Sequence, residues 1–354
     1  GLYMTVVGIL VLIASLRYEV AIPLTKTEEE TNNMLAVSVC SLFSTLFIIS
    51  IILYFIPILT DYLQSSLGNL WPYRAMIPLG VFAIGAYQIC VSYATHKQTF
   101  KAISKTKIYQ GYGGPISQII LGLAGANIWG LITGFVIGQS MGTSILFKRL
   151  IPYPRQIMKD ISKEKIKAMA WRFRDFPLFS SFAAIIGTLG GESLLIIFIT
   201  TIYNSTAVIG FLFLINRIVG RPLLMISTSI LKVYTGDASK TQSSDPKAMK
   251  ERFLNVIRFQ FIIVATWLVL VNATAKYIIP FVFGEQWAGC VPYIHILTIS
   301  YLPAMTLHAV NNTLQLLEKQ KLSLIWDSTR LLVLICMFAL SYVYKIDVMQ
   351  LLLA

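Results

Sequence analysis

The sequence predicts an all-α membrane protein whose chain crosses the bilayer many times. Three observations predict this class: the composition, a succession of long apolar stretches, and an alternation of basic and nearly uncharged loops. The chain is 56% hydrophobic and 13% charged, with a mean hydropathy of +0.71, whereas a soluble domain carries roughly a quarter charged residues. Backbone groups in lipid must be hydrogen-bonded within their own segment, so each stretch is expected to be a helix.

A helix of about 20 mostly apolar residues crosses the hydrocarbon core. Ten stretches approach or exceed this length, and an eleventh begins near residue 347: they are 2–23, 34–56, 75–95, 108–125, 127–147, 176–200, 206–232, 253–280, 288–316 and 322–344. Residues 108–147 contain no charged side chain, so two spans joined by a tight turn at 125–127 are expected. Because the chain begins inside one apolar run and ends in another, we expect at least one span before Gly1 and the rest of one after Ala354.

Basic residues are concentrated in every second loop. Together these loops contain 22 of the 29 Lys and Arg residues. These loops hold Arg17 and Lys26; Lys97, Lys101, Lys105 and Lys107; nine residues from Lys148 to Arg174; Lys232, Lys240, Lys247, Lys250 and Arg252; and Lys319 and Lys321. The opposite loops carry only Arg74, Lys276 and Lys345. An excess of Lys and Arg marks cytoplasmic loops. The net charge of +13 therefore reflects topology and anionic headgroups, and no nucleic-acid partner is expected.

The longest polar stretch, 148–175, divides the spans into two sets. With one span added in front and the last one completed, the plan becomes six plus six. We expect an N-lobe at 1–147 with spans two to six, a basic cytoplasmic linker at 148–175, and a C-lobe at 176–354 with spans seven to eleven and the start of the twelfth. Two-bundle transporters share this duplicated plan, with the substrate path between the halves. The linker could equally be a helix on the lipid surface.

Four arginines lie inside predicted spans, where the loop-charge pattern does not account for them: Arg217, Arg221, Arg258 and Arg330. Ionisable groups inside spans cost about 2.5–3.5 kcal/mol each and are functional candidates by default. Arg217 and Arg221 are four residues apart and share a helix face. Pro222 follows them and is expected to kink the helix or free a carbonyl group.

Two acidic residues lie in the same half of the chain, Asp327 three residues before Arg330 and Glu192 close to Gly187. One interpretation is internal pairing, of Asp327 with Arg330 and of Glu192 with another arginine. The other is a cavity with excess positive charge for an anionic substrate. Arg258 is close enough to the cytoplasmic end of its span to snorkel there.

A polar stripe follows one face of span 288–316: His308, Asn312, Gln315 and Lys319. It is equally compatible with interhelical hydrogen bonds and with a hydrated cavity that meets sugar hydroxyls. Gly134, Gly138 and Gly142 form a ridge that predicts close helix packing. The glycine-rich segment 111–115 predicts a broken helix.

The chain shows no metal-ligand spacing, no nucleophile–base triad and no large loop to house chemistry. Its four cysteines lie singly in apolar runs. We therefore expect a transporter and not an enzyme, with no resident cofactor and no metal site.

Several motifs occur in a fixed order along the chain. They are Leu16 to Ile22, Tyr93 to Gln110, Gly130 to Gly134 with Gly138-Gln139, Phe176 to Ser181, Gly210 with Arg217 and Pro222-Leu223, and Phe283 to Gly289. With these motifs the chain resembles the polysaccharide-transport (O-antigen flippase) family of the multidrug/oligosaccharidyl-lipid/polysaccharide exporter superfamily. It departs from the family pattern at two places. At 182–190 the usual proline and asparagine are missing, and at 318–321 relatives often carry a Gly-Arg or Gly-Lys turn.

The resemblance implies twelve helices in two six-helix lobes of the multidrug-exporter type, with both termini cytoplasmic. It implies alternating-access export of an undecaprenyl-diphosphate-linked oligosaccharide, the repeat unit of O-antigen, capsule or exopolysaccharide, across the bacterial inner membrane. Expected partners are this substrate, membrane lipids and the polymerase and chain-length machinery of the same pathway.

The residues provide candidates for each step of such export. Arginine forks match phosphate oxygens, so we expect a cationic cavity to grip the diphosphate, made by Arg217, Arg221, Arg330, Arg258 and Arg17. The side chains expected to meet sugar hydroxyls are His308, Asn312, Gln315 and Gln110. Glu192 and Asp327 are candidates for coupling to H⁺ or Na⁺. Two alternatives stay open, a multidrug antiporter of the same fold and a membrane-embedded polysaccharide polymerase or ligase.

Overall fold

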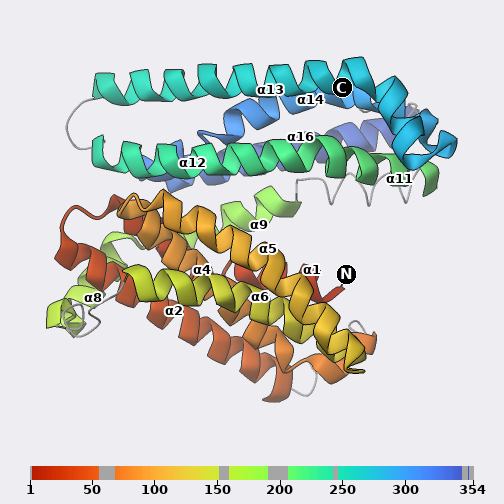
Figure 1. Ribbon diagram of the computed structural model, residues 1–354. Coiled ribbons are helices and arrows are strands. Elements are labelled where there is room, and N and C mark those ends of the chain that lie inside the picture. Colours follow the sequence, from red (N-terminus) through yellow and green to blue (C-terminus); the bar gives the residue numbers. More distant parts are fainter. Residues whose placement is uncertain are drawn as a thin grey trace. The chain divides into compact units, whose positions relative to one another are not determined.

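The computed structural model describes residues 2–55, 68–150, 159–189, 206–241, 246–344 and Gln350. No strand occurs in these residues, and seven of their helical segments are long and apolar enough to cross a membrane. These are Glu28–Tyr54, Met76–His96, Asn127–Lys148, Gly210–Ser239, Lys247–Phe283, Glu285–Leu316 and Gln320–Tyr344. The predicted class, an all-α polytopic membrane protein, is confirmed (Figure 1).

The chain divides into two compact units, Gly1–Ile185 and Ile186–Ala354. The first unit contains α1 (Leu2–Val11), η1 (Tyr18–Leu24), α2 (Glu28–Phe55), η2 (Gly68–Tyr73), α4 (Met76–His96), α5 (Phe100–Leu123), α6 (Asn127–Leu150), α8 (Lys163–Arg172), η3 (Phe176–Ser180) and the start of α9 (Ser181–Leu189). The helix of the basic linker, α8, thus lies in the first unit, where it packs against α2.

The first predicted span, 2–23, is not one helix. The α-helix ends at Val11, turns follow, and the chain continues as the 3₁₀ helix η1. Leu16 and Arg17 have positive φ angles of 51° and 60°. A left-handed backbone at two consecutive residues cannot continue a right-handed helix, so the span is broken at this point.

Helices α5 and α6 form a tight hairpin, as the sequence predicts. Gly125 supplies the left-handed turn residue with φ 79°. The glycine ridge of α6 lies directly on α5, since a Cβ on Gly138 would come within 2.6 Å of Gly114 Cα. The prediction of a broken helix at 111–115 is wrong, because α5 runs unbroken from Phe100 to Leu123 through Pro115. Glycine on both helices permits the close approach that holds this segment helical.

Three acidic residues begin α2 and pair with cations from two other segments. The pairs are Glu28 with Lys97, Glu29 with Lys165, and Glu30 with Arg172 at 3.3 Å. Carboxylates are also favoured at a helix N-terminus by its dipole. Asn32 and Asn33 add hydrogen bonds to Asp160, through its carboxylate at 2.9 Å and its carbonyl at 3.0 Å. Together these contacts fix the linker helix to α2.

The second unit continues from the end of α9 with a further series of helices. They are α11 (Thr206–Ile215), η4 (Asn216–Gly220), α12 (Arg221–Thr241), α13 (Pro246–Phe283), η5 (Glu285–Cys290), α14 (Val291–His308), α15 (Thr313–Leu316) and α16 (Gln320–Tyr344). Helices α12 and α13 form a long hairpin (Figure 1). The core of the second unit is apolar and includes Ile215, Leu223, Val264 and Ile294. The predicted span 288–316 is interrupted after His308, where turns at 309–312 replace the α-helix.

Candidate functional site

Arg217 and Arg221 lie at a π-helical turn. The turn, η4, spans Asn216–Gly220 and directly precedes Pro222 in α12. Proline has no backbone N–H to donate into the helix, and the wider turn accommodates this loss. The irregularity expected at Pro222 is therefore confirmed as a π-turn, a feature that occurs frequently at functional sites.

Both arginines of the turn are exposed on the second unit. Among the described residues, no carboxylate lies within 4.0 Å of either guanidinium. The opposite side of the turn is buried, with Val219 and Leu223 fully inside the core. A packed turn that presents two unneutralised guanidinium groups can bind an anion through charge-assisted hydrogen bonds.

Arg330 has a different environment from this pair. Its Nη2 donates a 2.9 Å hydrogen bond to the carbonyl oxygen of Gly187 and lies 3.7 Å from Asp327 Oδ1. The side chains of Arg330 and Asp327 are 45% and 20% exposed. The pairing that we considered for these two residues is thus present, although the backbone carbonyl is the closer partner. Arg258 is exposed on α13, and among the described residues it has no ion pair.

The polar stripe of span 288–316 is divided between two environments. Asn312 Nδ2 donates to Thr235 Oγ1 at 3.2 Å, and Thr313 bonds the Tyr234 hydroxyl at 2.9 Å. The interhelical hydrogen bonds that the stripe suggested are therefore present at Asn312. By contrast, His308 Nδ1 and Gln315 Oε1 are buried without a hydrogen-bond partner among the described residues. Such groups are costly unless water or a ligand satisfies them.

The sequence reasoning missed a buried polar network next to this stripe. Gln260 on α13 is fully buried and donates to Ser227 Oγ at 2.5 Å and to the Met305 carbonyl at 3.3 Å. Ser227 also donates to that carbonyl, at 3.2 Å. A glutamine inside an apolar span was the available signal. The Gln260 Oε1 atom is buried without a partner in the described part of the chain, so the interior of the second unit has unused acceptor capacity.

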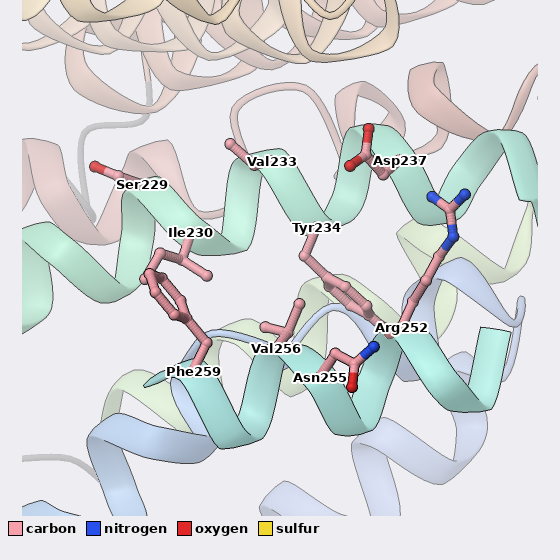
Figure 2. Close-up of a pocket in the computed structure, with 9 residues that line it drawn as sticks. All are labelled: Ser229, Ile230, Val233, Tyr234, Asp237, Arg252, Asn255, Val256 and Phe259. Carbon is pink, nitrogen blue, oxygen red and sulfur yellow. The ribbon is translucent and has the colours of Figure 1, made fainter. Parts of the chain in front are cut away.

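A cavity of about 470 Å³ opens between α12 and α13 (Figure 2). Its lining is mainly apolar and includes Val233, Val256 and Phe259, while Asp237 and Arg252 lie toward the end where the two helices connect. The basic residues Lys247 and Lys250 lie close to that end, in the first turns of α13. An apolar cleft with an arginine at the membrane surface suits a hydrocarbon chain with an anionic headgroup. The sequence predicts Arg252 only as one of the cytoplasmic basic residues and does not predict this cleft.

The first unit supplies Arg17 and Gln110 as candidates. Arg17 lies at the break of the first span, and its Nε is buried without a partner among the described residues. Glu19, two residues on, is 4% exposed and accepts a 2.5 Å hydrogen bond from Ser15. Gln110 packs at the glycine ridge and donates to Gln139 Oε1 at 3.2 Å. Its contacts are those of a helix-packing residue.

The structure joins some candidates and leaves others apart. Asp327 and Arg330 are in contact, whereas Arg217 and Arg221 lie at η4 and the start of α12 and Arg258 lies on α13. Glu192 lies outside the described residues. No group of three or more His, Cys, Asp or Glu side chains that could hold a metal occurs in the described part of the chain.

Comparison with known proteins assigns the chain to a family. A sequence profile of a family described as polysaccharide biosynthesis protein matches residues 1–292. No curated protein and no solved structure matches the chain. The profile covers most of the 354 residues, including the π-turn with both arginines. The chain is therefore a member of the polysaccharide biosynthesis protein family, in agreement with the resemblance seen in its motifs.

Proposed function

We propose that this protein is a flippase for an undecaprenyl-diphosphate-linked oligosaccharide, the repeat unit of an O-antigen, capsule or exopolysaccharide. Its place is the bacterial inner membrane, with cytoplasmic termini and alternating access between the two faces. Membership of the polysaccharide biosynthesis protein family supports a role in making or exporting a polysaccharide. The many membrane-spanning helices support transport.

One observation carries the proposal: Arg217 and Arg221 are exposed at a π-turn, without a described acidic partner. A diphosphate carries about two negative charges, and each planar guanidinium can donate two parallel hydrogen bonds to phosphate oxygens. The packed side of the turn fixes the backbone, so only the two arginine side chains must be ordered when the anion binds. Arg258 and Arg330 of the same unit are further cations for this headgroup.

The same proposal assigns roles to the remaining groups. The unsatisfied polar atoms of His308 and Gln315 bond sugar hydroxyls, directly or through water, and Asn312 holds the helices beside them. The lipid chain stays in hydrocarbon. Coupling to H⁺ or Na⁺ through Asp327 or Glu192 drives the cycle, since moving one charge through the membrane potential is worth about 2.3 kcal/mol per 100 mV.

Substitution of the two π-turn arginines tests this function. We expect Arg217→Ala and Arg221→Ala to reduce flipping of a lipid-linked oligosaccharide in proteoliposomes at least tenfold, because each removes a charge-assisted contact. The lysine variants should retain part of the activity, since the charge remains but the fork is lost. Lys250→Ala, which removes an exposed cation near the start of α13, is the control.

Two results would count against the proposal. Full flipping by both alanine variants at normal protein level would show that these arginines do not hold the substrate. Drug efflux without any glycan transport would favour the multidrug antiporter, whose cationic substrates call for acidic residues in place of arginines. Polymer formation by the purified protein from lipid-linked units would favour the polymerase.

A further inference from the structure

Four aromatic side chains and one arginine form two sets of ring contacts in the first unit, Arg74 with Tyr54 and Trp71, and Tyr73 with Trp129. They are Tyr54 near the end of α2, Trp71 and Tyr73 in η2, Arg74 directly after η2, and Trp129 in the first turn of α6. Helix α4 separates Arg74 from the basic residues at 97–107, which mark the opposite end. The positive-inside rule therefore places this cluster, hereafter the Arg74 cluster, at the outward face.

The Arg74 guanidinium is held by aromatic faces. Its Cζ lies 4.7 Å from the centroid of the Trp71 ring and 5.1 Å from that of Tyr54. Beside it, Tyr73 and Trp129 pack edge to face with centroids 4.8 Å apart. Cation–π attraction stabilises such an arrangement by about 0.5–2 kcal/mol. The rings thus fix the plane of the guanidinium before any ligand arrives.

The charge of Arg74 is not neutralised by any described acid. No described carboxylate lies within 4.0 Å of its guanidinium, and its Nε is buried without a hydrogen-bond partner in the described residues. Aromatic belts at membrane surfaces account for Trp and Tyr at this level. They do not account for an arginine assembled among these rings on the side where basic residues are rare.

This arrangement matches the chemistry of an acidic sugar. The free edge of a guanidinium pairs with a carboxylate through two parallel hydrogen bonds. Aromatic faces carry partial negative charge and pack well against the C–H face of a pyranose ring. Tyr54 and Trp129 are 45% and 43% exposed, so ring surface is available.

We propose that the Arg74 cluster is an outward-facing binding site for an acidic sugar of the exported oligosaccharide, with the carboxylate at Arg74 and the pyranose on the rings. The identity of the ligand as a glycan rests on the proposed function. The site would receive the headgroup after it has crossed the membrane.

Binding of a soluble sugar tests this site separately from transport. The protein is reconstituted in nanodiscs of phosphatidylcholine and titrated calorimetrically with a glucuronate-containing disaccharide or with its neutral glucose analogue. We expect the acidic disaccharide to bind at least tenfold more tightly than the neutral one. Arg74→Gln should abolish this preference, and Arg74→Lys should lose most of it because the planar fork is gone. Lys276→Ala, which removes the other described outward cation, should change nothing.

Several outcomes would overturn the inference. The first is equal binding of the acidic disaccharide by Arg74→Gln and by wild type. The second is the absence of binding by a wild-type protein that flips substrate. The third is competition by phosphatidylglycerol in the disc, which would make Arg74 a lipid anchor. Trp129→Phe keeps an aromatic face and serves as a second variant if Arg74→Gln fails to fold. If the wild type binds the acidic sugar through Arg74 but flips no lipid-linked substrate, the flippase proposal alone fails.

Discussion

Arg330 donates a 2.9 Å hydrogen bond from Nη2 to the carbonyl oxygen of Gly187, which ties α16 to the end of α9 inside the second unit. A Cβ at Gly187 would lie 3.4 Å from Asp327 Oδ1 and 3.6 Å from Arg330 Nη2, so the side chains of both α16 residues lie against this position. One of the four unexplained arginines thus connects two helices, whereas Arg217 and Arg221 remain available for a ligand.

Replacing Arg330 should therefore affect stability as well as transport. Arg330→Ala removes a hydrogen bond from a charged donor, worth about 1.5–3 kcal/mol when buried, and the 45% exposure of this side chain places the loss near the lower end. We expect a Tm several degrees below wild type by differential scanning fluorimetry in detergent. Arg258→Ala, on an exposed arginine without a described ion pair, should leave the Tm unchanged. Equal Tm values for the two variants would show that the Gly187 contact contributes nothing.

A methyl group on the glycine ridge should destabilise the first unit. The Cβ of Gly138→Ala would come within 2.6 Å of Gly114 Cα, a backbone atom that cannot rotate away. Overpacking of this kind costs about 1–3 kcal/mol, and thermal unfolding of the purified variant measures it. Gly111→Ala on the facing helix is the matched control, because nothing lies within 4 Å of its added methyl. A Gly138→Ala protein as stable as Gly111→Ala would contradict the observed packing of α5 on α6.

The linker helix should detach from α2 when its ion pairs are removed. Hydrogen–deuterium exchange of residues 163–172 should become several-fold faster in the double variant Glu29→Gln/Glu30→Gln, because the partners of Lys165 and Arg172 are lost. Exposed pairs contribute only about 0.2–1 kcal/mol each, so high salt should have the same effect. Glu164→Gln, on α8 itself and without a described ion pair, serves as control; unchanged exchange in the double variant would argue against the contact.

The same contact should be insensitive to pH near neutrality. The hydrogen bond to Glu29 and its negative charge raise the pKa of Lys165 above the ordinary value of 10.5. A raised lysine pKa gives stability that is fully present below the unfolded value and is lost only as pH rises through the folded one. The hydrogen-exchange rates of α8, divided by the intrinsic exchange rate of an unfolded peptide at each pH, should stay constant between about pH 6 and pH 9. A marked loss of protection within that range would assign the contact to another group.

The buried glutamine of the second unit should be more important for folding than its exposed counterpart. Gln260→Ala leaves Ser227 Oγ without the donor that Gln260 supplies and removes one of the two side-chain donors to the Met305 carbonyl, which keeps Ser227. We expect a cost of about 1–3 kcal/mol. Gln286→Ala removes the same side chain from an exposed position. Thermal unfolding should show a lower Tm for the first variant only, and equal values would indicate that the network is not formed.

Prediction from the sequence succeeded where one property dominates over a whole segment. Apolar length identified helices such as α2, α13 and α16, and spaced glycines identified the packing of α6 on α5. It failed where a few backbone dihedral angles determine whether a helix continues, as at Leu16 and Arg17, which break the first span. Pattern alone also could not separate Arg330, which has a carbonyl partner, from Arg217, which has no described partner. The carbonyl partner of Arg330, at Gly187, lies 143 residues away in the sequence.

The sequence by itself determined the membrane class, the helical content and the short set of charged residues inside apolar segments. Hydrophobic burial and the cost of charge in lipid act on every residue locally, so composition and spacing are sufficient for these conclusions. Only the tertiary structure decided that Gly187 holds Arg330, that Gln260 and Ser227 form a buried network, and that Arg74 lies against aromatic rings. Except for that of Arg74 with Trp71, these contacts join different segments, and their geometry arises when the helices pack.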